Sequence, residues 1–173
     1  YNNTMRAIFK GFLCYLESNL IKIIYLHSKF NIMSFQFKIL EKSRINDIIP
    51  LVQELTSFKV SEALLKERFA EMVTQNYECA VIFNGETLIG VSGLWFCTRH
   101  YVGKTVELDH VYIDEGYRNK GLGKKFLNWI YDYVKSKGCN SAELNTYVQN
   151  YPSHKFYYNE DFEILGYHFL KTF

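Results

Sequence analysis

Two acidic residues lie on an apolar run that leads into a glycine-rich loop. The carboxylates are suited to proton transfer, and the loop is suited to binding a phosphate. Glu107 and Asp109 belong to the run 106–113, whose composition predicts a β-strand. Residues two apart on a strand point to the same face, so the two carboxylates are expected together. Either could accept a proton as a general base, or be a solvated or hairpin-paired charge. His110 is expected on the opposite face from Asp109, with a structural role.

The loop that follows the run is a candidate phosphate site. It reads Arg118-Asn119-Lys120-Gly121-Leu122-Gly123 and opens a helix-like apolar pattern. A strand that enters a helix through a tight loop presents free backbone N–H groups at the positive end of the helix dipole. Arg118, Lys120 and Lys124 add positive charge. The loop matches neither a Walker A motif nor G-x-G-x-x-G, and an ordinary strand-to-helix turn is the alternative.

Apolar periodicity predicts the element order β-α-α-β-β-β-α-β-α-β, an α+β domain. Ser43 or Asn46 is expected to cap the first helix. Asn84-Gly85 is expected to close a hairpin, and residues 97–105 to form a connection. The expected strands are 35–39, 79–83, 88–96, 106–113, 142–147 and 164–172, and the expected helices are 45–55, 61–75, 122–138 and 153–159.

Length and composition limit the class of protein. The 173 residues suit one domain with a core, and a net charge of +2 is too small to favour nucleic acid or an anionic membrane as partner. The four cysteines form no C-x-x-C pair, which favours free thiols in the cytoplasm. The histidines form no metal-binding pattern, so no metal is expected.

The first 32 residues differ from the rest. The stretch 11–30 is apolar but interrupted by charges, which argues against a membrane span or a signal peptide. We expect residues 1–32 to be an N-terminal extension outside the catalytic unit, and residues 33–173 to be the catalytic domain.

The segment from Glu107 to Leu127 resembles the acetyl-CoA-binding motif of the GNAT N-acetyltransferases, in which an apolar-Tyr-Val strand precedes a Tyr-Arg-Gly-x-Gly-x-Gly loop. Downstream, Asn150 and the segment 153–162 are similar to the family's Asn…Ala-x-x-Phe-Tyr-x-x-x-Gly-Phe segment. The resemblance covers about 35–173. It implies a single GNAT-like α+β domain, with a mixed, mostly antiparallel sheet flanked by helices.

The same resemblance implies roles for individual residues. Backbone groups of 111–113 would pair with the pantetheine arm, amides of 119–124 would hold the pyrophosphate, and Asn150 would bond the pantetheine or the thioester end. The implied cofactor-binding set is Val111, Tyr112, Ile113, Arg118, Asn119, Lys120, Gly121, Leu122, Gly123, Lys124 and Asn150. Tyr157 would protonate the leaving thiolate, with Tyr158 as its rival.

Three further points of alignment matter. Asp109 falls where spermidine-type acetyltransferases carry their catalytic carboxylate. Asn119 replaces the first loop glycine, which is tolerable because asparagine accepts a positive φ better than most residues. Asp161 replaces the glycine before Phe162, so the turn there is expected to be built differently.

The predicted function is transfer of an acetyl group from acetyl-CoA, a co-substrate, directly to a primary amine, with Asp109 or Glu107 as base and Tyr157 as acid. No cysteine is placed for an acyl-enzyme route. Aromatic and basic residues between 95 and 101 are expected near the acceptor cleft.

The acceptor is a small-molecule or peptide amine whose identity stays open. The alternatives are a longer acyl donor, a protein N-terminal acceptor, and a non-catalytic acyl-CoA-binding sensor or interaction module. Because GNAT proteins are often dimers, a homodimer is also implied.

Overall fold

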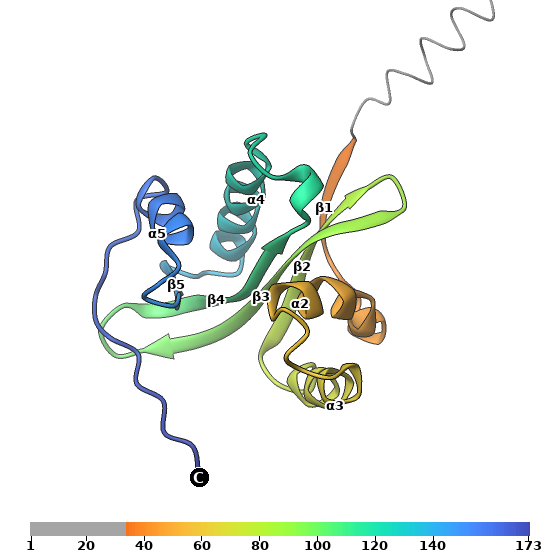
Figure 1. Cartoon of the computed structure of the whole chain (residues 1–173). Helices are drawn as coiled ribbons and strands as arrows, with labels where there is room; N and C mark the ends of the chain where they lie inside the picture. The colour runs from red at the N-terminus through yellow and green to blue at the C-terminus, as the bar shows by residue number, and fades with distance from the viewer. Residues whose placement is uncertain (1–33) are drawn as a thin grey trace, which may run out of the picture. The chain divides into compact units, whose positions relative to one another are not determined.

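A five-stranded sheet runs through residues 34–173, the part of the chain that this computed structural model describes (Figure 1). The strands lie in the order β1-β2-β3-β4-β5. The first three pairings are antiparallel and the β4–β5 pairing is parallel, which confirms the predicted mixed sheet. The strands are β1 (Phe35–Ile39), β2 (Tyr77–Asn84), β3 (Thr87–Arg99), β4 (Gly103–Ile113) and β5 (Ser141–Leu144).

Helices lie against both faces of this sheet (Figure 1). They are η1 (Lys42–Ile48), α2 (Ile49–Leu55), α3 (Glu62–Met72), η2 (Glu115–Tyr117), α4 (Leu122–Ser136) and α5 (Tyr151–Tyr158). Ser61 caps α3 by accepting a hydrogen bond from the Leu64 N–H at 3.3 Å. The predicted capping by Ser43 or Asn46 is wrong, because both residues lie inside η1, which begins after Glu41. No helix within residues 34–173 is long and apolar enough to cross a membrane.

Two separate apolar clusters hold the helices to the sheet. On one face, η1, α2 and α3 pack on alternate residues of β2 together with Val91 and Tyr112. On the other face, α4 packs on the intervening residues of the sheet, through five buried side chains at helical spacing. These five are Leu122, Phe126, Leu127, Ile130 and Val134.

The hairpin of β3 and β4 is longer than the sequence predicts. Residues 97–99 and 103–105 pair with one another as strand, so the predicted connection shrinks to a tight turn. Gly103 follows that turn with φ of 77°, a left-handed conformation that glycine adopts without strain. The residues predicted to lie near the acceptor cleft, 95–101, therefore belong to the end of this hairpin.

The predicted last strand, 164–172, does not form. Residues after α5 are irregular apart from a turn, and large apolar side chains such as Leu165 and Phe169 are exposed. A strand needs a neighbour to satisfy its backbone hydrogen bonds and a face to bury. Within the described residues this segment has neither, so its apolar content alone does not make it a strand.

A β-bulge interrupts β4 beside the predicted carboxylates. Gly93 pairs with Asp109 and Val91 pairs with Tyr112, so the single residue between them on β3 faces two on β4. One of the two is His110, whose φ of 35° is unusual for a residue other than glycine. The bulge turns the His110 side chain to the same face as Asp109, so the prediction of opposite faces is wrong.

Candidate active site

A pocket of about 500 Å³ opens beside the β3–β4 hairpin. It is bounded by both strands, by the residue that follows β5, and by the C-terminal segment. Its lining residues are Trp95, Phe96, Cys97, Arg99, Glu107, Leu108, Asp109, Asn145 and His168. The two carboxylates that the sequence predicts on one face therefore do line one pocket.

Glu107 is fully engaged by its neighbours. Its Oε2 lies 2.9 Å from Nη2 of Arg99, and its Oε1 accepts a hydrogen bond from Nδ2 of Asn145 at 2.7 Å. Arg99 also contacts Glu143 on β5, with Nε 3.0 Å from Oε2. The Glu107 carboxylate thus acts as part of an ion-pair network that fixes the pocket wall.

Asp109 is more open. Its side chain is 51 % exposed, against 29 % for Glu107. Its Oδ1 accepts from the backbone N–H of His110 at 2.8 Å, and its Oδ2 lies 3.2 Å from His110 Nδ1 and 3.4 Å from Trp95 Nε1. Burial raises the pKa of Asp109, but the hydrogen bonds that it accepts from His110 and Trp95 outweigh burial, so the pKa lies below its ordinary value. Asp109 is therefore ionised at neutral pH and faces the pocket.

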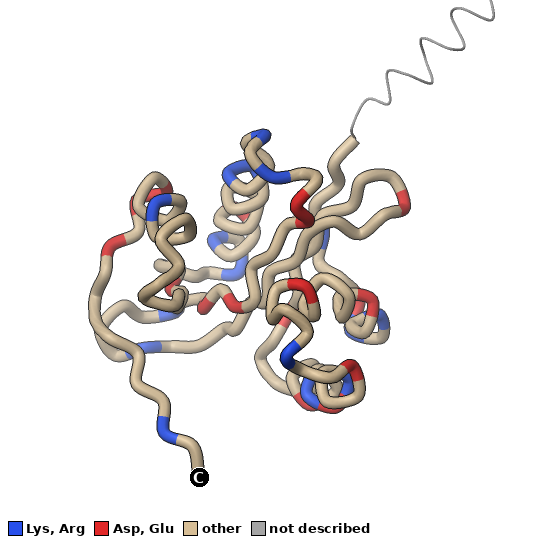
Figure 2. Tube along the Cα trace, viewed as in Figure 1, with Lys and Arg blue, Asp and Glu red and all other residues tan. Residues whose placement is uncertain are grey.

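The glycine loop has the geometry of an anion site. Gly121 caps α4 with φ of 72°, and Asn119 adopts φ of 61°, as expected for the residue that replaces a glycine. Arg118 Nε donates to the carbonyl of Ile113 at 2.7 Å, and Lys120 Nζ donates to the carbonyl of Gly116 at 2.9 Å. Figure 2 shows basic residues at this loop and the first turn of α4. N–H groups at the start of a helix, with positive charge around them, suit a phosphate.

β4 and β5 separate just before this loop. They pair only from Thr105 to Leu108 on β4, with Ser141 to Leu144 on β5. β4 continues to Ile113, so the backbone of 111–113 has no partner strand on that edge within the described residues. An extended ligand could add to this edge as a strand does.

α5 packs against the start of α4. A Cβ on Gly123 would lie 3.2 Å from Cζ of Phe156, so the two helices approach more closely than most side chains would allow. After α5, Asp161 adopts φ of 62°. The turn that usually takes a glycine is therefore formed here by an aspartate in the left-handed region.

Tyr157 and Asn150 do not line the 500 Å³ pocket. Tyr157 packs between Phe156 and Phe162, and burial raises its pKa to about 12. The Tyr157 side chain is half-buried, whereas Tyr158 is 54 % exposed. Asn150 is exposed and caps α5, accepting from the Ser153 N–H at 3.4 Å.

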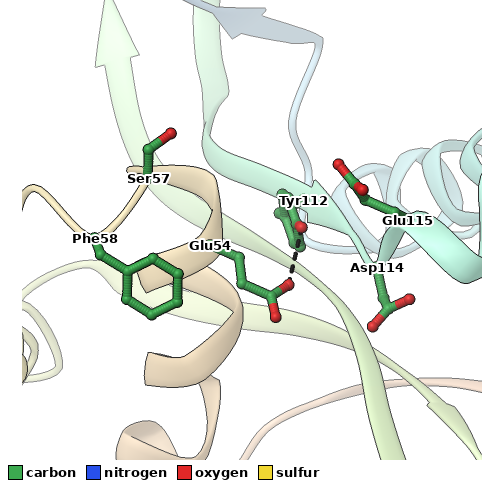
Figure 3. Close-up of a pocket in the computed structure, with 6 residues that line it drawn as sticks. All are labelled: Glu54, Ser57, Phe58, Tyr112, Asp114 and Glu115. Carbon is green, nitrogen blue, oxygen red and sulfur yellow. Dashed lines mark hydrogen bonds between the residues drawn. The ribbon is translucent and has the colours of Figure 1, made fainter.

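A second pocket, of about 470 Å³, lies beside the end of β4 on the α2 side (Figure 3). Tyr112 donates its hydroxyl hydrogen bond to Glu54 at 2.9 Å, and the Arg118 guanidinium lies 4.8 Å from the Tyr112 ring centroid. Asp114 and Glu115 complete an acidic lining, so this pocket does not suit phosphate. Within residues 34–173, no group of three or more His, Cys, Asp or Glu side chains is arranged to hold a metal ion.

Four pocket residues were not predicted as site residues from the sequence: Cys97, Leu108, Asn145 and His168. The sequence predicts Asn145 inside the strand 142–147, whereas β5 ends at Leu144 and leaves Asn145 directly after the strand, beside the pocket. The sequence predicts Cys97 in a connection, whereas that stretch is strand. His168 is brought to the pocket by the path of the C-terminal segment, for which no sequence pattern exists.

Comparison with known proteins identifies the family. Residues 45–162 match the acetyltransferase (GNAT) family, and the chain belongs to that family. It is 26 % identical to mouse (Mus musculus) thialysine N-epsilon-acetyltransferase over 117 residues, covering 60 % of this chain and 69 % of the relative. It is 28 % identical to glucosamine 6-phosphate N-acetyltransferase of Arabidopsis thaliana over 129 residues, covering 68 % of this chain and 86 % of the relative.

A solved structure carries the same fold. Aminoglycoside N-acetyltransferase AAC(6')-Iy in complex with CoA superposes with a TM-score of 0.69 at 14 % identity, covering 80 % of this chain and 94 % of that one. The chain is therefore an N-acetyltransferase, as the sequence predicts.

Proposed function

We propose that this protein transfers an acetyl group from acetyl-CoA directly to a primary amine, with Asp109 as the general base. The observation that carries the proposal is the pocket, into which a half-exposed, ionised Asp109 faces. An amine must lose a proton before or as it attacks a thioester, and a carboxylate within reach can accept that proton. Glu107 is the weaker candidate for the base because Arg99 and Asn145 occupy both of its oxygens.

The proposed donor site combines the glycine loop with the open edge of β4. The pyrophosphate of acetyl-CoA would accept hydrogen bonds from the loop amides of 119–124, with Arg118 flanking. The pantetheine arm would lie along 111–113, where β4 and β5 separate. Asn150 would reach it only by giving up its bond to Ser153. A structural neighbour with the same fold is in complex with CoA, which supports CoA as the donor.

Tyr157 is the proposed acid. Thioester cleavage releases a thiolate, which leaves more readily when a proton is supplied. Because burial raises its pKa to about 12, Tyr157 keeps its proton at neutral pH. Tyr158 is largely in solvent, which favours Tyr157 over its rival.

The proposed acceptor is a small cationic amine. The pocket carries two carboxylates, Glu107 and Asp109, against the one guanidinium of Arg99, which is paired with Glu107. The charge of Asp109 can therefore attract a cation, and the Trp95 ring in the same pocket can face it. Relatives named for thialysine and glucosamine 6-phosphate also act on amines. We propose no single acceptor among them.

The deciding experiment is a thiol-release assay with acetyl-CoA against polyamines, amino acids, aminosugars and short peptides. The proposal expects turnover with at least one amine and its loss in Asp109→Asn. Tight CoA binding by the wild type, with no acetylation across the panel, would instead support the binding-module alternative.

Cys97→Ser separates direct transfer from a covalent route. Cys97 lines the pocket, so an acyl-enzyme through its thiol is the mechanism to exclude. Direct transfer expects Cys97→Ser to retain wild-type turnover. A loss as large as that of Asp109→Asn, with [¹⁴C]acetyl retained on the wild-type protein, would establish the covalent route.

We also propose that residues 1–32 lie outside the catalytic unit and that the protein forms a homodimer. Removal of residues 1–32 is expected to leave folding and turnover intact. Light scattering of the full chain would show twice the chain mass if the dimer forms.

A further inference from the structure

Tyr77 and His110 form a buried pair behind Asp109. Tyr77 is 1 % exposed and the His110 side chain is 10 % exposed. Tyr77 Oη lies 2.9 Å from His110 Nε2, and His110 Nδ1 lies 3.2 Å from Asp109 Oδ2. One hydrogen bond and one close polar contact therefore connect the interior of the sheet to the carboxylate in the pocket.

The chemistry of the three groups fixes the direction of these bonds. An ionised carboxylate only accepts, so the proton between His110 and Asp109 belongs on Nδ1. A neutral imidazole then has an acceptor at Nε2, which takes the hydroxyl proton of Tyr77. Burial raises the pKa of Tyr77, so the phenol keeps that proton and continues to donate. Both partners thus favour the same tautomer of His110.

Packing leaves His110 little freedom to turn away. A Cβ on Gly93 would lie 2.3 Å from Cε1 of His110, so the ring lies directly over the glycine backbone. Phe69 of α3 meets the ring edge-on, with centroids 5.5 Å apart. The titratable groups that face the pair are Asp109 on β4 and Cys79 on β2, and burial raises the pKa of the Cys79 thiol to about 12. The elements packed on the other sides, α3 and β3, contribute Phe69, Gly93 and Trp95, which carry no charge.

We propose that Tyr77 and His110 are positioning residues for the transfer reaction. Tyr77 holds His110 in the Nδ1–H tautomer, and His110 holds the Asp109 carboxylate ionised and oriented toward the acceptor amine. This inference rests on the proposed function, in which Asp109 accepts the proton of the amine. The β-bulge is what makes the arrangement available, because it places two neighbouring residues of β4 on one face.

The tautomer is measurable without any assay of activity. In ¹⁵N-labelled protein at neutral pH, long-range ¹H–¹⁵N spectra distinguish a protonated from an unprotonated ring nitrogen. His110 is expected to show Nδ1 protonated and Nε2 unprotonated in the wild type, with Nε2–H gaining population in Tyr77→Phe. Tyr133→Phe removes a tyrosine hydroxyl that bonds Glu78 on the opposite face of the sheet from Tyr77, and is expected to leave the His110 signals unchanged.

Kinetics test whether the pair acts through Asp109. Tyr77→Phe is expected to lower kcat by about 2–10-fold, the effect of one neutral hydrogen bond, with KM for acetyl-CoA unchanged. The acid limb of the kcat/KM profile is expected to move to higher pH, because Asp109 loses a firmly held donor. In an Asp109→Asn background the same substitution is expected to cost nothing further, since the interaction it supports is already gone.

A second pair of variants covers the case in which Tyr77→Phe folds poorly. His110→Gln keeps an N–H donor, whereas His110→Leu does not, and the two side chains are similar in size. The proposal expects His110→Gln to retain more turnover than His110→Leu at equal folded fraction.

Three results would overturn the inference: an Nε2–H tautomer in the wild type, equal turnover of His110→Gln and His110→Leu, or the same fold loss from Tyr77→Phe with and without Asp109. A different result would contradict the proposed function and leave the hydrogen-bond arrangement intact. If Asp109→Asn turns over normally while the expected tautomer is observed, the pair is a structural link only and Asp109 is not the base.

Discussion

The glycine loop follows β4 and the acidic pocket lies between β4 and its neighbours, yet the two sites depend on different parts of a residue. The loop offers backbone N–H groups, so its geometry depends on positive φ angles at Asn119 and Gly121. The pocket offers side chains, so it depends on which face each residue of β4 takes. A site formed by backbone N–H groups tolerates many different side chains. A site formed by side chains can lose its function when a single side chain, such as the His110 ring, is displaced. The following experiments test that difference.

The largest effect is expected from the two carboxylates. Asp109→Asn is expected to lower kcat by roughly 10²–10⁴-fold, the usual contribution of a general base, with KM for acetyl-CoA nearly unchanged. Glu107→Gln is the matched control, because it removes the charge of a second carboxylate in the same pocket. Both oxygens of Glu107 are already bound, by Arg99 and by Asn145, so this variant is expected to lose less turnover than Asp109→Asn. Steady-state kinetics with the best amine would measure both. A larger loss in Glu107→Gln would exchange the roles of the two residues.

Gly93→Ala is expected to disturb the pocket through packing. Its Cβ would lie 2.3 Å from His110 and 2.9 Å from Tyr77, so both rings must move. Overpacking of this kind costs about 1–3 kcal/mol of the free energy of unfolding. Urea denaturation would measure that loss. The double variant Gly93→Ala/His110→Ala is expected to recover only part of the stability, because Tyr77 still lies 2.9 Å from the new Cβ and its hydroxyl loses its partner. A Gly93→Ala protein as stable and active as wild type would refute the packing.

The loop should respond to backbone strain alone. Gly121 and Gly85 both have a positive φ, 72° and 59°, and a Cβ added to either would meet no neighbour within 4 Å. Alanine at either is expected to cost roughly 1–2 kcal/mol of the free energy of unfolding. Calorimetric titration with CoA should show weaker binding for Gly121→Ala only. Equal CoA affinity in the two variants would remove the phosphate role from the loop.

The smallest effect expected is a change in how stability depends on pH. Because the folded pKa of Asp109 is lowered, its ionised form stabilises the folded state above the ordinary aspartate pKa of about 3.9, and that contribution is lost as the pH falls through the folded pKa. The side chain is half exposed, so the contribution is small. Urea midpoints should fall slightly more steeply with acid in wild type than in Asp109→Asn. Parallel curves would contradict the lowered pKa.

The sequence predicted the loop better than the pocket, for a physical reason. Strand, glycine loop and helix follow one another in the chain, so local composition determines them, and Asn119 takes the positive φ expected of it. The order of elements along the chain, apart from the last strand, and the shared face of the two carboxylates were likewise predictable from apolar periodicity. The face of His110 was not, because a bulge is an extra residue in a pairing that alternation alone cannot reveal.

The C-terminal segment shows a second limit. Residues 164–172 have the apolar content of a strand, but strand formation needs a hydrogen-bonding partner, which composition does not specify. His168 reaches the pocket through that irregular path. Cys97 and Asn145 lie where a strand is longer or ends earlier than predicted, and element boundaries are the least predictable part of a fold.

The bulge in β4 also bears on how this strand can change by mutation. Deletion of one residue at the bulge would restore the strict alternation of side chains between the two faces of β4. Only one of Asp109 and His110 could then share a face with Glu107. Before the bulge Asp109 lies on the face of Glu107, and after it Tyr112, an even-numbered residue, lies on that same face. A single extra residue therefore sets both the face of His110 beside the pocket and the face of Tyr112 at the end of the strand.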